Sequence, residues 1–166
     1  MNKGFRPTTA KIREALFNIL SAKIKDALFL DLFAGSGLVG IDAALYGARE
    51  VTLVENDYNA VKIIKKNIEK ASADNIILVK DDVLRYLKKN SLKFDITFID
   101  APYGDNTADK ALDIIDEKIL LSKHGIIVVE HYHKKEFSGK FSNISLFDRR
   151  KYGQTVLTFF KQTGRD

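Results

Sequence analysis

Short apolar segments alternate along this chain with longer segments of helical periodicity. The first apolar run, residues 27–30, is apolar on both faces and ends at Asp31, just before a glycine-rich turn. A run this short and this uniformly apolar is typical of a buried parallel strand. Comparable runs predict further strands at residues 51–55, 76–80, 94–100 and 125–131.

The segments between these runs carry apolar side chains at helical spacing. One helix is predicted after Thr8 and Thr9, either of which can act as its N-cap, with its apolar face running from Ile12 to Leu20. Further helices are predicted at residues 39–46, 58–71, 83–88 and 108–117. This alternation of strands and helices indicates an α/β fold, with a mostly parallel sheet covered by helices on both faces.

The end of the chain follows a different pattern. Residues 144–149 and 155–160 are strand-like and are separated by a turn around Gly153 that is too short for a parallel crossover. We therefore expect these two strands to pair antiparallel at the edge of the sheet. With only two prolines and no linker-like stretch, residues 1–166 should form a single domain.

Composition excludes several classes of protein. The chain has no cysteine, which excludes disulfides and thiolate metal sites. No apolar run approaches the roughly 20 residues that span a bilayer, and the first residues lack the apolar segment of a signal peptide. We therefore expect a soluble, cytoplasmic protein with no membrane contact, and a monomer by default.

The charge of the chain favours a polyanionic partner. Lysine and arginine total 27 against 22 acidic residues, a net charge of +5, and such an excess promotes contacts with phosphates. Two basic clusters near the chain ends could flank one cleft, although a solvated basic surface is the alternative. These clusters are Lys3, Arg6, Lys11 and Arg13, and Arg149, Arg150 and Lys151.

The glycine-rich turn predicts a cofactor site. Residues 31–40 read Asp-Leu-Phe-Ala-Gly-Ser-Gly-Leu-Val-Gly, in which Gly35, Gly37 and Gly40 match the dinucleotide pattern GxGxxG. The turn follows the first strand at its carboxyl end, where open α/β sheets bind cofactors. The pattern alone does not separate a nicotinamide dinucleotide from S-adenosylmethionine.

Three acidic residues at strand ends help to separate these cofactors. Asp31 would repel a pyrophosphate but can hold the ammonium of a methionine moiety; the alternative is a turn or helix cap. Glu55 can accept hydrogen bonds from both ribose hydroxyls, or it is simply solvated. Asp82 can accept from an adenine amino group, or it caps the next helix. This charge pattern favours S-adenosylmethionine.

A second motif follows the strand predicted at residues 94–100. Asp100, Ala101, Pro102 and Tyr103 place a carboxylate, a stiff turn and an aromatic ring together. The exocyclic amine of a base is a poor nucleophile, since its lone pair is delocalised into the ring. If Asp100 and a neighbouring carbonyl accept its two N–H groups, the lone pair can turn toward a methyl donor. Tyr103 would stack on a base that has left its helix; a surface turn is the alternative.

Together these residues resemble class I methyltransferases that act on exocyclic amines, and among them the bacterial small-subunit ribosomal RNA guanine-N2 methyltransferases of the RsmD type. The resemblance covers nearly the whole chain. It is carried by Arg6-Pro-Thr-Thr9, Arg13-Glu-Ala-Leu-Phe-Asn18, the turn at residues 31–37, Gly47-Ala48, Glu55, Asn67, Phe94-Asp95, Asp100 to Tyr103, Glu130 and Tyr152-Gly153.

The resemblance implies a seven-stranded Rossmann-like sheet with a reversed final strand. It implies a ribosomal RNA or small-subunit substrate and catalysis at Asp100, Pro102 and Tyr103. Donor contacts are expected from Asp31, Phe33, Gly35, Gly37, Glu55, Asn56, Asp82 and Asp100. RNA contacts are expected from Arg6, Thr8, Arg13 and Asn18, which would form a lid within residues 1–22, and from Arg149 and Arg150.

One position departs from the family pattern. Ala101 stands where the family usually has the first of two prolines. Its backbone carbonyl, which is the expected acceptor, is retained, so we expect slower turnover at most.

Three alternative functions remain open. One is a nicotinamide-dependent oxidoreductase, another a non-catalytic RNA-binding module on the same fold, and the third an adenine-N6 methyltransferase acting on DNA or another RNA. His131 and His133 have no convincing third ligand in the sequence, so we expect a polar strand end there and no metal.

Overall fold

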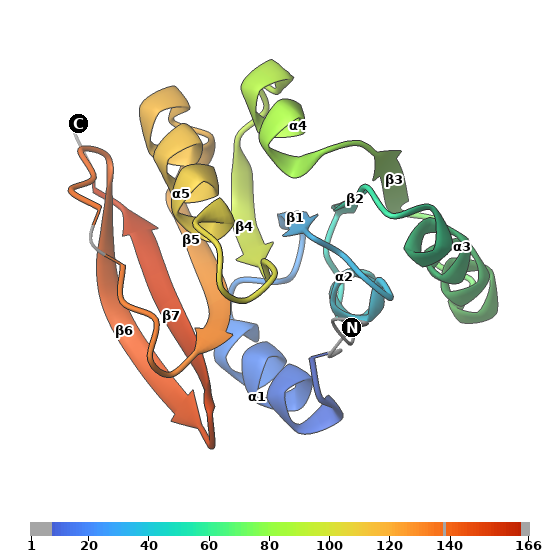
Figure 1. Cartoon of the computed structure of the whole chain (residues 1–166). Helices are drawn as coiled ribbons and strands as arrows, with labels where there is room; N and C mark the ends of the chain where they lie inside the picture. Colours follow the sequence, from blue (N-terminus) through green and yellow to red (C-terminus); the bar gives the residue numbers. More distant parts are fainter. Residues whose placement is uncertain (1–7, 138, 164–166) are drawn as a thin grey trace.

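A seven-stranded sheet forms the centre of the computed structural model, which describes residues 8–137 and 139–163. The strand order is β3-β2-β1-β4-β5-β7-β6, and helices cover both faces (Figure 1). In chain order the elements are α1 (Ala10–Leu20), β1 (Leu28–Leu32), α2 (Leu38–Leu45), β2 (Glu50–Glu55), α3 (Tyr58–Ala71), β3 (Ile76–Lys80), α4 (Val83–Lys89), β4 (Phe94–Ile99), α5 (Thr107–Lys118), β5 (Leu121–Tyr132), β6 (Ile144–Tyr152) and β7 (Thr155–Gln162).

The directions of the strands confirm the predicted topology. β1 pairs parallel with β2 and β4, β2 with β3, and β4 with β5. β7 is antiparallel to both of its neighbours, β5 and β6, as expected for the edge pair. β5 begins at Leu121 rather than at Gly125, because a register shift lets Leu121 pair with Phe94 ahead of the main ladder. The polar residues 122–124 hid this extension in the sequence pattern.

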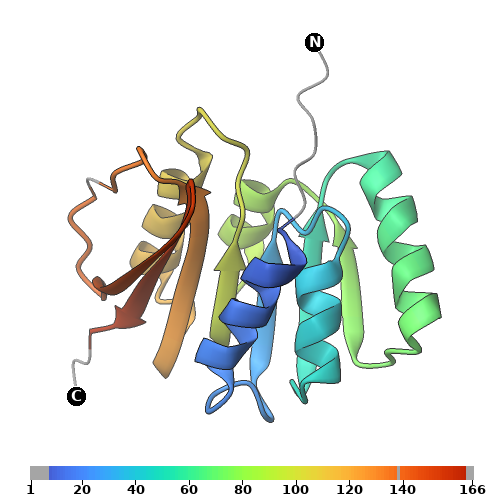
Figure 2. The ribbon, with the colours of Figure 1, turned by 90° about the horizontal axis from the view of Figure 1, so that it is seen from below.

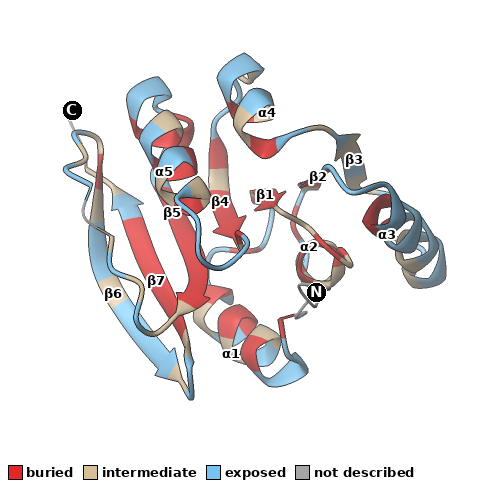
Figure 3. Cartoon of the chain, viewed as in Figure 1, coloured by how far each residue is buried: buried red, intermediate tan, exposed pale blue. Residues whose placement is uncertain are grey.

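Two hydrophobic cores hold the helices against the sheet. Alternate side chains of a strand point to opposite faces, so Phe29 of β1 packs with α1, α2 and α3, whereas Leu30 and Leu32 pack with α4 and α5. The central strands are buried, and the outer sides of the helices and most of β6 are exposed (Figure 3). The result is a three-layer arrangement with one core on each face.

The N-terminal ends of α1 and α3 are fixed by hydrogen bonds from backbone N–H groups to capping side chains. Of the two threonines predicted as possible N-caps, Thr9 caps α1 by accepting from the backbone N–H of Ile12. Thr8 is buried and does not cap the helix; its hydroxyl donates to Glu130 instead. Asp57 caps α3 in the same way, through the N–H of Ala60. Each cap satisfies a backbone N–H that the helix itself leaves without a partner.

The strand order reverses between β1 and β4. From β1 the sheet grows through β2 to β3 on one side, and from β4 through β5 on the other. The carboxyl ends of these parallel strands lie at one end of the molecule, together with the first turn of α1 (Figure 2). This is the place where open α/β sheets bind ligands. Within the described ranges, no helix combines the length and the apolarity needed to cross a membrane.

Candidate active site

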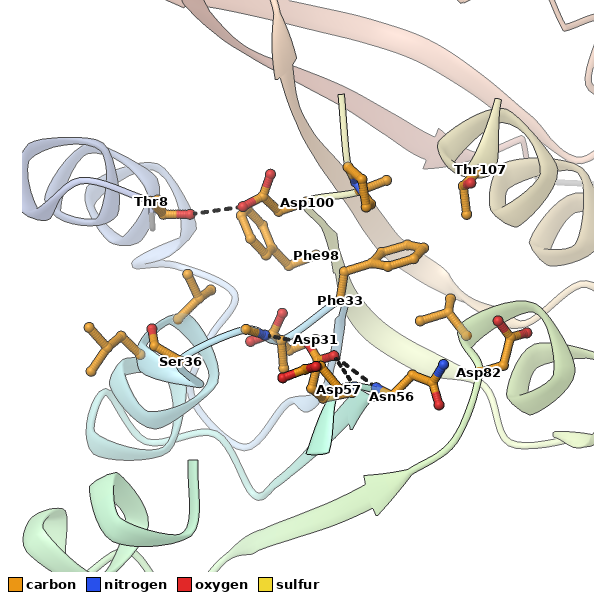
Figure 4. Close-up of a pocket in the computed structure, with 18 of the residues that line it drawn as sticks. Thr8, Asp31, Phe33, Ser36, Asn56, Asp57, Asp82, Phe98, Asp100 and Thr107 are labelled. Carbon is orange, nitrogen blue, oxygen red and sulfur yellow. Dashed lines mark hydrogen bonds between the residues drawn. The ribbon is translucent and has the colours of Figure 1, made fainter. Parts of the chain in front are cut away.

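An open cavity of about 1010 Å³ lies at the point where the strand order reverses. Its walls come from the glycine-rich turn after β1, the ends of β2 and β4, the start of α4 and the residue just before the N-cap of α1 (Figure 4). Sequence-predicted residues in its lining are Thr8, Arg13, Asp31, Phe33, Gly35, Glu55, Asn56, Asp82, Asp100, Pro102 and Tyr103. The structure thus brings most of the expected site together.

Asp31 is the most buried acid of the cavity. Its side chain is 1% exposed, and Oδ2 accepts a hydrogen bond of 3.1 Å from the backbone N–H of Gly40 in α2. Burial raises the pKa of Asp31 to about 8, and the charges of Glu55 and Glu130 act in the same direction. Without a cation nearby, this carboxyl is therefore poorly solvated in its ionised form. It is a place where a ligand ammonium would be stabilised.

Glu55 is held by three backbone N–H groups. Oε2 accepts from Gly35 at 2.8 Å, and Oε1 accepts from Asn56 and Asp57, each at 2.8 Å. A carboxylate offers about four acceptor positions, so one position on Oε2 remains for a ligand. Glu55 can thus accept from one ribose hydroxyl without rearrangement, whereas the two predicted contacts would require it to release a backbone N–H.

The glycine-rich turn shapes the cavity through unusual backbone angles. Phe33 has a φ of 62°, in the left-handed region that bulky residues rarely occupy, and its side chain lines the cavity. Gly37 has a φ of 77° and is the N-cap of α2. It does not line the cavity, and a Cβ there would lie 3.1 Å from Ile64. Its role in the structure is to form the turn.

Asp82 caps a helix and also lies where it can contact a ligand, the two roles that the sequence left open. Its Oδ1 accepts from the N–H of Arg85 and so caps α4. The residue also lines the cavity and is exposed, and its second oxygen stays available to a ligand. Asn56, which follows β2, is exposed at the same end of the cavity.

The loop after β4 places the expected catalytic residues at the other end. The pKa of Asp100 lies well above its ordinary value, first because of burial and then because of the charges of Glu130 and Asp31, while a hydrogen bond from Thr8 acts in the opposite direction. The Thr8 hydroxyl lies 3.5 Å from Oδ2 of Asp100. Tyr103 is 45% exposed, and its ring packs edge-on against Tyr132.

Glu130 is part of the family resemblance, but the sequence analysis assigned it no role in the site. It is 4% exposed in β5, and its Oε2 accepts a hydrogen bond of 2.7 Å from the Thr8 hydroxyl. Burial raises its pKa, and the contact with Thr8 lowers it. A signal was present in the sequence, because Glu130 follows the apolar residues 126–129 in the same way that Asp31 and Asp100 follow theirs.

The residues expected to contact RNA are spread over the structure. Arg13 lines the cavity, but its guanidinium bonds Asp42 and the backbone carbonyl of Thr8, which ties the start of α1 to α2. Asn18 is exposed on α1 and does not line the cavity. Arg6 lies outside the described residues.

The second expected RNA-binding pair lies on the edge strand. Arg149 and Arg150 are exposed on β6, where they pair with Glu136 and Asp148. Neither residue lines the cavity. The two basic clusters of the sequence therefore do not meet at this cavity within the described part of the chain.

Comparisons with known proteins identify relatives over nearly the whole chain. The family model described as Conserved hypothetical protein 95 matches residues 1–161. The chain is 38% identical over 133 residues to Ribosomal RNA small subunit methyltransferase D of Buchnera aphidicola, covering 80% of this chain and 70% of the relative. It is 30% identical over 159 residues to the protein of the same name from Escherichia coli, covering 96% and 80%.

Solved structures show the same fold. One is named "Putative methyltransferase yhhF from Escherichia coli"; its TM-score is 0.88 at 26% identity, and the match covers 98% of this chain and 92% of that one. A hypothetical protein from Thermus thermophilus matches with a TM-score of 0.79 at 30% identity, covering 96% and 90%. The chain therefore has a Rossmann-like methyltransferase fold and belongs to the family described as Conserved hypothetical protein 95, the RsmD family.

Proposed function

We propose that this protein transfers a methyl group from S-adenosylmethionine to the exocyclic N2 amino group of a guanine in small-subunit ribosomal RNA. The observation that carries the proposal is the pair of carboxyl groups that line the large cavity at the end of β1 and β4, the buried Asp31 and the partly buried Asp100. A third carboxyl group, the buried Glu130, is held next to this cavity by Thr8. Relatives named for methylation of small-subunit ribosomal RNA support the substrate class.

The charges of the cavity fit this donor better than a dinucleotide. S-adenosylmethionine carries an ammonium and a sulfonium, whereas a dinucleotide carries a pyrophosphate. Asp31 and Glu55 would be a repulsive surface for phosphates but a favourable one for cations and hydroxyls. We assign Asp31 to the ammonium, Glu55 to the ribose, and Asn56 and Asp82 to the adenine end. This assignment disfavours the nicotinamide-dependent alternative.

Asp100 is assigned to the acceptor amine. When bound, S-adenosylmethionine supplies the methyl group. Asp100 accepts one N–H of the amine and the carbonyl of Ala101 accepts the other, so that the nitrogen lone pair faces the donor. As the N–C bond forms, the S–C bond of the donor would break and leave a neutral thioether, and the nitrogen would carry an extra proton. The carboxylate form of Asp100 would take this proton, which its raised pKa favours. Tyr103, exposed at the same loop, is assigned to stacking on the base.

Replacing the carboxyl group tests this role. In Asp100→Ala, methyl transfer should fall by at least about 100-fold, since a positioned acceptor and base contributes about that much. Donor affinity should stay within a few fold. The measurements are transfer of labelled methyl to RNA and donor binding by calorimetry, with Asp113→Ala, an exposed position on α5, as the control. Unchanged transfer by Asp100→Ala would refute the assigned role.

Two alternatives give distinct results. An adenine-N6 methyltransferase would use the same acceptor chemistry and would place the label in adenine. A non-catalytic RNA-binding module would bind RNA without transferring any label.

A further inference from the structure

A second cavity, of about 460 Å³, lies beside the first. Its volume is in the range of small-molecule sites, about 300–1,000 Å³. Ala101, Pro102 and Tyr103 line both cavities, so the loop after β4 is their common wall. On the far side, the second cavity is lined by the end of β5 and by Phe137. A molecule bound there would lie next to the donor cavity.

Glu130 lies between the two cavities. It lines the second cavity, while its Oε2 is held by the hydroxyl of Thr8, which lines the first. A carboxylate offers about four acceptor positions, and the Thr8 hydroxyl takes one of them. Glu130 therefore has the capacity to accept from a ligand that brings a hydrogen-bond donor into the second cavity.

The remaining walls suit a planar base. Tyr103 and Tyr132 are in edge-to-face contact, with ring centroids 6.4 Å apart, and both line the cavity. The ring of His131 is fixed by a bond of 2.7 Å between Nε2 and Oγ1 of Thr158. Burial lowers the pKa of His131, so its ring adds no positive charge at neutral pH.

Two lysines also line the cavity, Lys134 and Lys135, and Lys135 is paired with Asp109. Aromatic walls beside a buried carboxylate, here Glu130, are the features of a base-reading pocket. The second carboxylate of the lining, Asp105, is exposed.

We propose that the second cavity holds the acceptor base and that the carboxylate of Glu130 accepts the N1–H of guanine. This inference rests on the proposed function. In guanine, N1 is a donor beside the 2-amino group, whereas in adenine, N1 is an acceptor beside the 6-amino group. Glu130 therefore attracts guanine and repels adenine. Asp100 lies near the same Thr8 hydroxyl, so an amine next to N1 would lie toward Asp100 and the donor cavity.

An acceptor analogue separates this role from general support of the fold. 2-Aminopurine keeps the 2-amino group but has no proton on N1. RNA substrates with guanine or 2-aminopurine at the target position are compared by kcat/KM. The wild-type protein should strongly prefer guanine. In Glu130→Gln, the side-chain amide can donate to N1, and the preference for guanine should fall by at least about 10-fold. Glu130→Asp, which keeps the charge, should not gain activity on 2-aminopurine.

Further measurements make each outcome decisive. Thermal unfolding and donor binding establish that each variant is folded. If Glu130→Gln does not fold, Thr8→Val is measured instead. Loss of the Thr8 hydroxyl favours the neutral acid form of Glu130, whose O–H can donate to N1 of 2-aminopurine. The preference for guanine should therefore fall in this variant as well. An unchanged preference in the folded variant overturns the assignment but leaves guanine methylation standing. Absence of any N2-methylguanine from wild-type reactions overturns the proposed function and this inference together.

Discussion

Replacing Asp31 with asparagine should make the donor-free protein more stable at alkaline pH. The asparagine keeps an oxygen that can accept from Gly40 but cannot ionise. In the wild type, burial raises the pKa of Asp31 from 3.8 to about 8. A carboxyl with a raised folded pKa contributes stability that is fully present below pH 3.8 and is lost as the pH rises through about 8.

The magnitude follows from the same pKa. Each pH unit between the ordinary and the raised value corresponds to about 1.4 kcal/mol. Over the roughly three units from pH 5 to pH 8, Asp31 should therefore cost the wild type about 4 kcal/mol of unfolding free energy relative to Asp31→Asn. Above about pH 8 the difference should level off, because the folded carboxyl is then ionised.

Urea denaturation of donor-free protein between about pH 5 and pH 9 measures this difference. Asp74→Asn, at an exposed position before β3, is the matched control and should follow the wild type. In parallel, Asp31→Asn should weaken donor binding by at least about 10-fold, because the ammonium loses its charged partner. Parallel stability curves for the wild type and Asp31→Asn would refute the reasoning, since they would mean that Asp31 is not destabilised by burial.

Three further substitutions test other parts of the structure. Gly40→Ala would place a Cβ 2.1 Å from Cδ2 of Leu53, so thermal unfolding should show a loss of about 1–3 kcal/mol and calorimetry a weaker donor affinity. Asp116→Ala would leave three backbone N–H groups near the start of β6 without their acceptor and should cost about 2–4 kcal/mol in urea denaturation; an unaffected midpoint would contradict this role. Glu55→Gln would place an amide NH₂ against backbone N–H donors and should weaken donor binding by at least about 10-fold, which a binding titration would detect or exclude.

The arrangement of the sheet could be predicted from the sequence because its strands are short and apolar on both faces. Such runs are typical of parallel strands that are buried on both faces. The acids Asp31, Glu55 and Asp100 could be placed at one edge for the same reason, since parallel strands end together. The extension of β5 to Leu121 could not be predicted, because residues 122–124 are polar and the pairing depends on a register shift.

The sequence pattern did not determine which partner each side chain bonds. The sequence shows Thr8 and Thr9 as equivalent caps, yet only packing against β5 decides that Thr8 bonds Glu130 and Thr9 caps α1. Gly37 matches the cofactor pattern but forms a turn behind the cavity wall. Asp82 illustrates the opposite case, because a helix cap and a ligand contact are compatible in one carboxylate.

The most direct test of the central claim is transfer of labelled methyl from S-adenosylmethionine to small ribosomal subunits that lack base methylation, followed by nucleoside analysis of the digested RNA. The proposed function predicts label in N2-methylguanosine. Label in a methylated adenosine, or no label while the donor is bound, would contradict it.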